Sequence, residues 1–168
     1  MNPFDLGPFT ENSDCKEQWV SRIKAAVEKA EHSANMCEAY ETVYCSVNIN
    51  FSKLCKLDFP KDASRCNEAG ANLRQISMLF TKIKKLMKSM RFMRNMTSTN
   101  LEFVTSLVNF ENITQSQLHE AIDIIELLER NDWLLGETIS IVKTTISEYR
   151  KRVEEMIKMY SKIGSNEE

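Results

Sequence analysis

The stretch Leu118–Tyr160, LHEAIDIIELLERNDWLLGETISIVKTTISEYRKRVEEMIKMY, places its apolar residues at alternating steps of three and four. An average step of 3.5 residues keeps one stripe of a long α-helix turned toward a neighbouring helix. The series comprises Leu118, Ala121, Ile125, Leu128, Asp132, Leu135, Ile139, Val142, Ile146, Tyr149, Val153, Met156, Tyr160 and Ile163. The stretch therefore predicts a long amphipathic helix, with Asp132 as the charged residue in its apolar stripe.

Two similar series precede this stretch. One runs from Trp19 to Leu54 and the other from Cys66 to Met90, again with steps of three and four residues. Glycine and proline are scarce, with four Gly and three Pro in 168 residues, and Pro60 is the only proline after the first ten residues. Since both residue types interrupt helices, their scarcity favours long helices over a fold with many turns.

Helix boundaries follow from end signals. Capping-box spacing, in which Thr or Asp precedes Glu or Gln by three residues, marks three helix starts. The pairs are Asp14 with Glu17, Thr99 with Glu102, and Thr114 with Gln117. Pro60 is expected to end the first helix and Gly164 the last. The predicted helices span residues 14–57, 63–96, 100–111 and 115–163.

These elements predict an all-α fold, an elongated antiparallel bundle of three long heptad-patterned helices, resembling a coiled coil, plus one short helix. Residues 14–163 are expected to form one bundle domain between a flexible or strapping tail (1–13) and an acidic tail (164–168). The short helix 100–111 either continues the second layer or folds back to make a four-helix section. Both arrangements fit the sequence.

Composition narrows the class of protein. The 22 Lys and Arg residues nearly balance 24 Asp and Glu residues, which argues against a nucleic-acid partner. Five cysteines, an odd number without a C-x-x-C motif, are typical of a reducing compartment. No signal-peptide-like segment opens the chain. We expect a cytoplasmic protein, with peripheral attachment to a membrane as an alternative and a secreted four-helix cytokine-like ligand as a minor one.

No catalytic, cofactor or metal site is predicted. His32 and His119 are the only histidines, and neither has the spacing of a metal-ligand pair or a catalytic triad. The five thiols fall on apolar stripes or in ordinary helical sequence, without a predicted cationic or histidine partner. The pattern therefore favours a protein that is not an enzyme, with no cofactor and no small-molecule substrate.

A basic, methionine-rich segment, TKIKKLMKSMRFMRNM, occupies residues 81–96. Its cationic residues are Lys82, Lys84, Lys85, Lys88, Arg91 and Arg94. This composition is typical of helices that bind anionic membranes or apolar clefts of partner proteins. The alternative is pairing within the chain, since a fold-back near residue 60 would set residues 82–94 beside the acids of residues 26–38.

The segment RNDWLLGE interrupts the last series. Asp132 occupies a stripe position, where a charge is costly unless it is exposed or paired. We expect either a kink with a buried tryptophan or an open place in the stripe. In the second case Trp133, Leu134 and Leu135 are a candidate docking patch.

The tripeptide Asn2-Pro3-Phe4 is a candidate linear motif. It resembles the peptide recognised by the EH domains of endocytic adaptors. The alternative is that Phe4, Leu6 and Phe9 strap the tail against the end of the bundle.

The run ISMLFTKIKKLMK (residues 76–88) is similar to core helices of small coiled-coil subunits in lysosome-positioning and organelle-biogenesis complexes. We therefore expect a non-enzymatic scaffold or adaptor subunit of an intracellular complex, of the organelle-trafficking or cytoskeletal and kinetochore type. Its partners would be other helical proteins or a second copy. The alternative is a BAR-like dimer that binds anionic membrane through residues 82–94.

Overall fold

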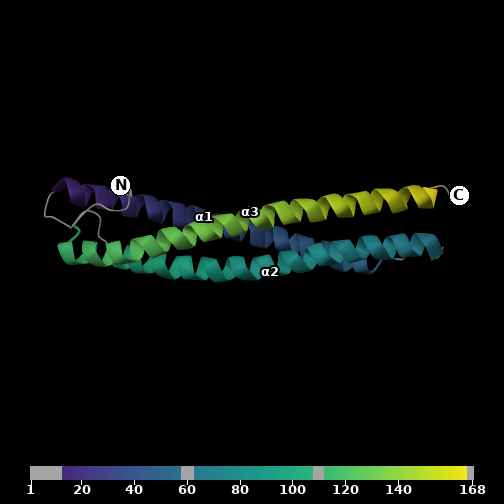
Figure 1. Cartoon of the computed structure of the whole chain (residues 1–168), viewed down its shortest axis with the longest axis horizontal. Helices are drawn as coiled ribbons and strands as arrows, with labels where there is room; N and C mark the ends of the chain where they lie inside the picture. Colours follow the sequence, from purple (N-terminus) through teal and green to yellow (C-terminus); the bar gives the residue numbers. More distant parts are fainter. Residues whose placement is uncertain (1–12, 58–62, 108–111, 166–168) are drawn as a thin grey trace. The chain divides into compact units, whose positions relative to one another are not determined.

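Three long helices make up the fold in a computed structural model of the chain (Figure 1). They are α1 (Ser13–Cys55), α2 (Ala63–Leu107) and α3 (Gln115–Ser165). The structure describes residues 13–57, 63–107 and 112–165, and 96% of them are helical, with no strand among them. The predicted all-α bundle is confirmed at this level. Within the described ranges, no helix has the length and hydropathy of a transmembrane span.

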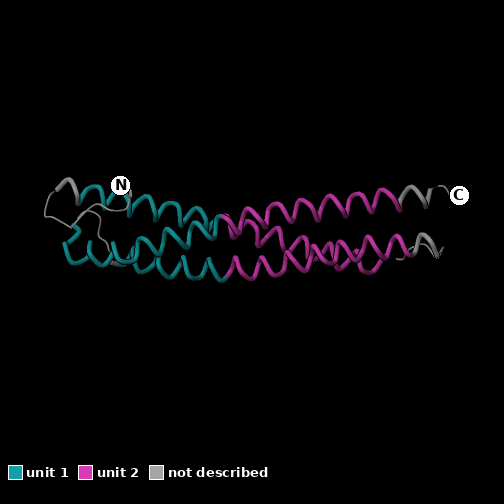
Figure 2. The backbone as a smooth tube through the Cα atoms, in the orientation of Figure 1, with its two compact units in different colours: residues 1–35, 92–136 teal, residues 36–91, 137–168 magenta. Residues whose placement is uncertain are grey.

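The helices contribute segments to two compact units (Figure 2). Unit 1 contains residues 1–35 and 92–136, and unit 2 contains residues 36–91 and 137–168. In each unit α1 and α3 run in the same direction and α2 runs against them (Figure 1). Each unit is therefore built from one segment of each helix.

The core of unit 1 follows the apolar series of the sequence. From α1 it contains Trp19, Ile23, Ala26, Val27 and Ala30, from α2 Val104, and from α3 Leu118, Ala121, Ile125 and Leu128, with Ile113 just before α3. Removing these side chains from water is the main stabilising contribution in this unit.

Unit 2 is held by a second set of buried side chains. They include Val47, Leu54, Ile76, Phe80, Ile83, Met87, Met90, Val142, Ile146 and Tyr149. The rings of Phe51 and Phe80 stack with centroids 4.2 Å apart, which fixes the register of α1 against α2. Cys55, at the end of α1, comes four residues after Phe51. Because the two helices are antiparallel, Cys55 lies about level with residue 76, four residues before Phe80 of α2. The first turns of α2 therefore extend beyond the end of α1.

This register corrects the expected pairing of the basic segment. A symmetric fold-back about residue 60 would have set residues 82–94 beside residues 26–38. Instead Arg91 contacts Glu41, with Nε–Oε1 and Nη2–Oε2 distances of 2.6 and 3.0 Å. The prediction failed because it assumed that α1 ends level with the start of α2, whereas α2 starts about three turns beyond the end of α1.

The separate helix predicted at 100–111 is not formed, because α2 continues without a break to Leu107. Residues 100–107 thus continue the second layer, as one of the two expected arrangements required. They do so as part of α2 and not as a separate helix. Thr99 does not cap, since its hydroxyl donates to the Asn95 carbonyl 2.9 Å away inside the helix. Thr97 and Val104 are buried, so the apolar stripe also runs through the expected break. Residues 108–111 lie outside the described residues.

The capping box predicted at the start of α3 is present. Gln117 N–H donates to Thr114 Oγ1 (3.2 Å), and Thr114 N–H donates to Gln117 Oε1 (3.1 Å). These two bonds satisfy amides that lack partners in a helical first turn. At the other end, α3 extends to Ser165, one residue beyond the expected stop at Gly164. Pro60 lies outside the described residues.

Candidate functional site

In unit 1 a charged pair covers the edge where α1 and α3 meet. Arg22 Nε lies 2.7 Å from Glu129 Oε1, and both side chains are mostly buried. The Arg22 guanidinium also lies 5.0 Å from the centre of the Trp19 ring. A charge-assisted bond of this kind fixes α1 against this flank of α3. The flank of α3 that carries Glu129 therefore faces α1.

A second charged pair, in unit 2, covers the edge between α1 and α2. Arg91 bonds Glu41 through two nitrogens, and its guanidinium lies 5.6 Å from the Tyr44 ring centre. The hydrogen bond to Glu41 raises the pKa of Arg91. In unit 2, the flank of α2 that carries Arg91 therefore faces α1.

The opposite flanks of α2 and α3 carry large apolar side chains. Since the Glu129 flank of α3 faces α1 in unit 1, the opposite flank of α3 turns toward α2. Residues between 38% and 65% exposed on and beside these flanks are Phe92, Met96 and Phe103 on α2 and Leu127 and Leu134 on α3. We name this set the α2–α3 face. The described part of α1 in unit 1 contributes no large exposed apolar side chain.

Spacing explains why this face forms one surface. Met96 and Phe103 are seven residues apart on α2, and Leu127 and Leu134 are seven apart on α3. Each pair therefore lies in one column beside the buried stripe of its helix. These residues lie outside the buried stripes and were therefore not among the predicted site residues. The signal that could have found them is this second, parallel series of sevens.

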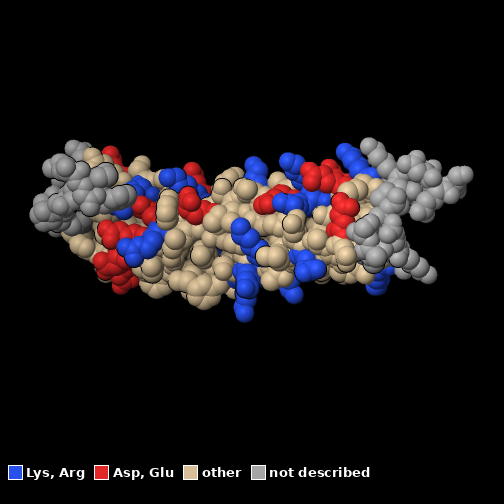
Figure 3. Space-filling view, turned by 45° about the vertical axis from the view of Figure 1, so that its right-hand side comes forward, with Lys and Arg blue, Asp and Glu red and all other residues tan. Residues whose placement is uncertain are grey.

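Charge is distributed unevenly around the face. Glu102, Glu120 and Asp123 are exposed near the end of unit 1, and Glu120 lies in the same column as Leu127 and Leu134. Exposed Lys82, Lys85 and Lys88 lie earlier on α2, in unit 2. In the view of Figure 3, acidic side chains gather beside a stretch of uncharged surface.

The six basic residues of segment 81–96 do not form one surface. Arg91 bonds Glu41. Lys84, seven residues earlier on the same flank, has its Nζ atom 5.8 Å from the centre of the Phe80 ring. Arg94 is partly buried. Lys82, Lys85 and Lys88 are exposed and remain available to a partner.

The candidate docking patch is also divided. Trp133 is 64% exposed, so the expected burial of this tryptophan is wrong, whereas Leu135 is fully buried. Consecutive helical residues point about 100° apart. As a result Leu134 belongs to the α2–α3 face, Trp133 projects elsewhere, and Leu135 packs in the core. Helix α3 continues through Asp132 and Gly136.

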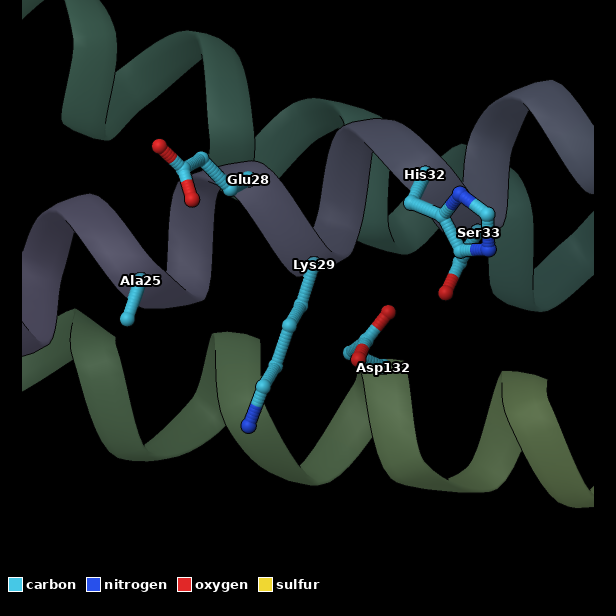
Figure 4. A pocket seen from close by; sticks show the side chains of 6 residues that line it. All are labelled: Ala25, Glu28, Lys29, His32, Ser33 and Asp132. Atoms are coloured by element: carbon cyan, nitrogen blue, oxygen red, sulfur yellow. The ribbon is translucent and has the colours of Figure 1, made fainter.

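Asp132 marks an open place in the stripe of α3. It lines a pocket of about 370 Å³ with Ala25, Glu28, Lys29, His32 and Ser33 of α1. Asp132 projects from α3 toward α1, the Ser33 hydroxyl points toward it, and Glu28 points away (Figure 4). Its Oδ1 atom is buried without a hydrogen-bond partner. Of the two expected outcomes at this position, the open stripe is the one observed.

The pocket contains serine, histidine and aspartate side chains but no assembled triad. His32 and Ser33 are consecutive on α1, so their side chains diverge, while a triad needs the imidazole between hydroxyl and carboxylate. The structure gives no hydrogen bond among these three described residues, and no cluster able to hold a metal ion occurs in the described part of the chain.

A second pocket, of about 260 Å³, lies in unit 2 between α2 and α3. Its lining includes Glu68, Asn72, Arg152 and Glu155. Arg152 is already engaged, because its Nη1 donates to Gln75 Oε1 at 2.5 Å. The Asn2-Pro3-Phe4 motif lies outside the described residues. The α2–α3 face is therefore the most developed candidate site.

No protein-family model, curated protein or solved structure matches this chain.

Proposed function

We propose that the protein is a non-enzymatic assembly subunit that binds an amphipathic helix on the α2–α3 face. One observation carries the proposal. In unit 1 a charged pair covers the edge between α1 and α3, while large exposed apolar side chains lie on the other flank of α3 and on α2. Exposed apolar patches of this kind are typical of protein-binding surfaces. A fourth helix would cover the patch as in a four-helix bundle.

The size of the face indicates what else the partner must supply. Completing the burial of five half-exposed large side chains contributes roughly 4–7 kcal/mol, on the scale of 1.5–3 kcal/mol per fully buried side chain. Micromolar affinity requires about 8 kcal/mol after the cost of association. Apolar contact alone therefore falls short, and contacts at the charged rim are needed.

The rim specifies the chemistry of those contacts. Glu120 and Asp123 are acidic and exposed at one end of the face. A partner helix with Lys or Arg beside its apolar stripe would place opposite charges against them. Such pairing contributes mainly to orientation and association rate.

Site-specific photo-crosslinking tests this proposal. A benzophenone amino acid is placed at Met96 in the full chain, expressed in cells, and the crosslinked peptides are identified by mass spectrometry. We expect crosslinks to one face of a helix, recurring at steps of three and four residues. The control is the same amino acid at Ile157, an apolar residue of unit 2 that is 50% exposed.

A second variant separates specific binding from general stickiness. Phe103→Glu with Leu127→Glu places two charges on the face without altering its buried neighbours, and it should abolish the Met96 crosslinks. Crosslinks that persist in this variant, or that form equally at Ile157, would contradict the proposal.

A second candidate function is binding to a membrane surface. Met78 is 72% exposed and lies seven residues before Lys85, which itself lies seven before Phe92. One outward column of α2 thus alternates apolar and cationic side chains, as in helices that lie on anionic lipid. Flotation with phosphatidylserine vesicles, compared with neutral vesicles, tests it, and Lys82→Glu with Lys85→Glu should abolish the binding.

A further inference from the structure

The pocket beside Asp132 lies entirely within unit 1, between α1 and α3. Asp132 occupies a position of the apolar stripe, between the fully buried Leu128 and Leu135. Its Oδ1 atom is buried and receives no hydrogen bond from the described residues. A carboxylate oxygen held away from water without a partner costs free energy, and a local cost of this kind is typical of a binding site.

The side chains around this carboxylate can accept hydrogen bonds. The Ser33 hydroxyl points toward Asp132, and His32 lines the same pocket (Figure 4). A carboxylate, a hydroxyl and an unprotonated imidazole offer three acceptors, and a primary ammonium group has three N–H donors. We infer that this pocket binds a primary alkylammonium group, which donates to Asp132, Ser33 and His32.

The charge and size of the pocket fit such a ligand. Among its described lining residues Glu28 and Asp132 are acidic and Lys29 is basic. The amine end of Lys29 is directed away from the Asp132 carboxylate (Figure 4). The volume of about 370 Å³ is near the lower end of the range of small-ligand pockets. It therefore suits a short alkylamine or the side chain of one lysine.

Lys29 is the competitor for this carboxylate within the chain. Its ammonium group has the same three donors as the proposed ligand, on a flexible stem that begins at the edge of the pocket. Removing its charge should therefore strengthen the binding of an external amine.

NMR of backbone amides in the full chain tests the inference, with n-butylammonium chloride as the probe at constant ionic strength. We expect saturable shifts of the Ser33 and Asp132 amides, with a dissociation constant of about 1–10 mM. Tetramethylammonium chloride carries the same charge without an N–H donor, and it should not produce these shifts. Equal shifts with both salts would overturn the inference.

Three variants connect the binding to the pocket. Asp132→Asn keeps the shape of the side chain and removes its charge, so it should weaken butylammonium binding about tenfold or more. The matched control is Asp123→Asn, an exposed position of α3 in unit 1 outside this pocket, which should leave binding unchanged. Lys29→Gln should bind the amine more tightly than the parent. Unchanged binding in Asp132→Asn would contradict the assignment.

Thermal denaturation separates a binding role of Asp132 from a role in folding. Asp132→Leu continues the apolar stripe and fills the pocket, so it should raise the melting temperature and abolish butylammonium binding. A lower melting temperature with amine binding retained would show that the carboxylate serves the fold, and the inference would fail.

A primary ammonium group is carried by free alkylamines and by lysine side chains of partner proteins. Nα-acetyl-lysine amide distinguishes them, because its peptide groups occupy the place of a partner's backbone. Binding as tight as that of butylammonium identifies a lysine side chain as the ligand, and binding of butylammonium alone identifies a free amine. If neither probe binds, the inference is overturned, while the crosslinking test of the α2–α3 face is unaffected.

Discussion

The hydroxyl group of Tyr149 on α3 donates a hydrogen bond to Oδ1 of Asn50 on α1, over 2.9 Å. Tyr149 is 1% exposed, whereas Asn50 is exposed, so the bond connects a buried phenol to the edge of unit 2. Burial raises the pKa of Tyr149 to about 12, with a smaller contribution from Cys55. The folded state therefore holds the phenol proton more tightly than the unfolded chain does.

Replacing Tyr149 with Phe should lower the free energy of unfolding by about 1 kcal/mol, because the ring stays buried and only the hydrogen bond is lost. Urea denaturation at pH 7 measures the change. Asn50→Ala should cost at least as much, about 1–3 kcal/mol, because it leaves the buried Tyr149 hydroxyl without its acceptor. A loss near zero in both variants would show that the bond does not contribute.

The raised pKa of Tyr149 predicts that the free energy of unfolding decreases at alkaline pH. The stabilisation due to the raised pKa is fully present below pH 10, the unfolded value, and is lost as pH rises toward about 12. Over this interval the parent should lose roughly 2–3 kcal/mol relative to Tyr149→Phe, at 1.36 kcal/mol per pH unit. Denaturation curves of both proteins at pH 8, 10 and 11.5 test this, because other titrating groups cancel in the difference. Parallel curves would contradict the assignment.

Two threonines with capping-box spacing should respond differently to alanine. Thr114 accepts a bond from the Gln117 amide at the start of α3, while Thr99 lies inside α2. Thr114→Ala should cost about 1 kcal/mol through the lost cap. Thr99→Ala should be neutral or stabilise by a few tenths of a kcal/mol, because alanine has the higher helix propensity. Equal losses in thermal denaturation would indicate that α2 begins a new helix at residue 99.

Thr97 offers a stabilising substitution. It is 1% exposed, and its hydroxyl oxygen is buried without a hydrogen-bond partner. Valine has nearly the same shape and no hydroxyl group, so Thr97→Val should raise the free energy of unfolding by about 1 kcal/mol. Thr97→Ser retains the hydroxyl and loses a methyl group, and should destabilise. A loss of stability in Thr97→Val would show that the hydroxyl is satisfied in solution.

Two neighbouring leucines of α3, Leu127 and Leu128, should affect different properties, namely binding and folding stability. Leu128 is fully buried and Leu127 is 44% exposed. Leu128→Ala should cost about 2–5 kcal/mol by leaving a cavity, whereas Leu127→Ala should cost less than about 1 kcal/mol. Leu127→Ala should also reduce the yield of the Met96 photo-crosslinks, because Leu127 belongs to the α2–α3 face. Equal stability losses would contradict the orientation of this part of α3.

The repeat of three and four predicted which residues are buried because it reflects the geometry of the helix itself. Ile125, Leu128 and Leu135 are buried as their spacing requires. Capping signals were less reliable, since a threonine hydroxyl can bond a carbonyl of its own helix equally well. Thr114 caps and Thr99 does not, although the two have the same spacing to a Glu or Gln.

The candidate site depended on information that periodicity does not contain. Which flank of α2 faces α1 follows from the Arg91–Glu41 pair, and the residue opposite Arg91 follows from the shift between the two helices. That shift arises where α1 ends relative to α2, and no spacing within either helix encodes it. Trp133 and Leu134 share a motif in the sequence, yet they lie on different sides of α3 because one residue turns a helix by about 100°.

The extension of α2 beyond Cys55 leaves its first turns without α1 beside them. There Glu68, Asn72 and Ile76 lie near Arg152, Glu155 and Met156 of α3 in an arrangement of two helices. Two helices shield backbone amides and apolar side chains less completely than three do. This end of unit 2 should therefore open by itself, ahead of global unfolding, and its amide protons should exchange with solvent earlier than those of the three-helix part.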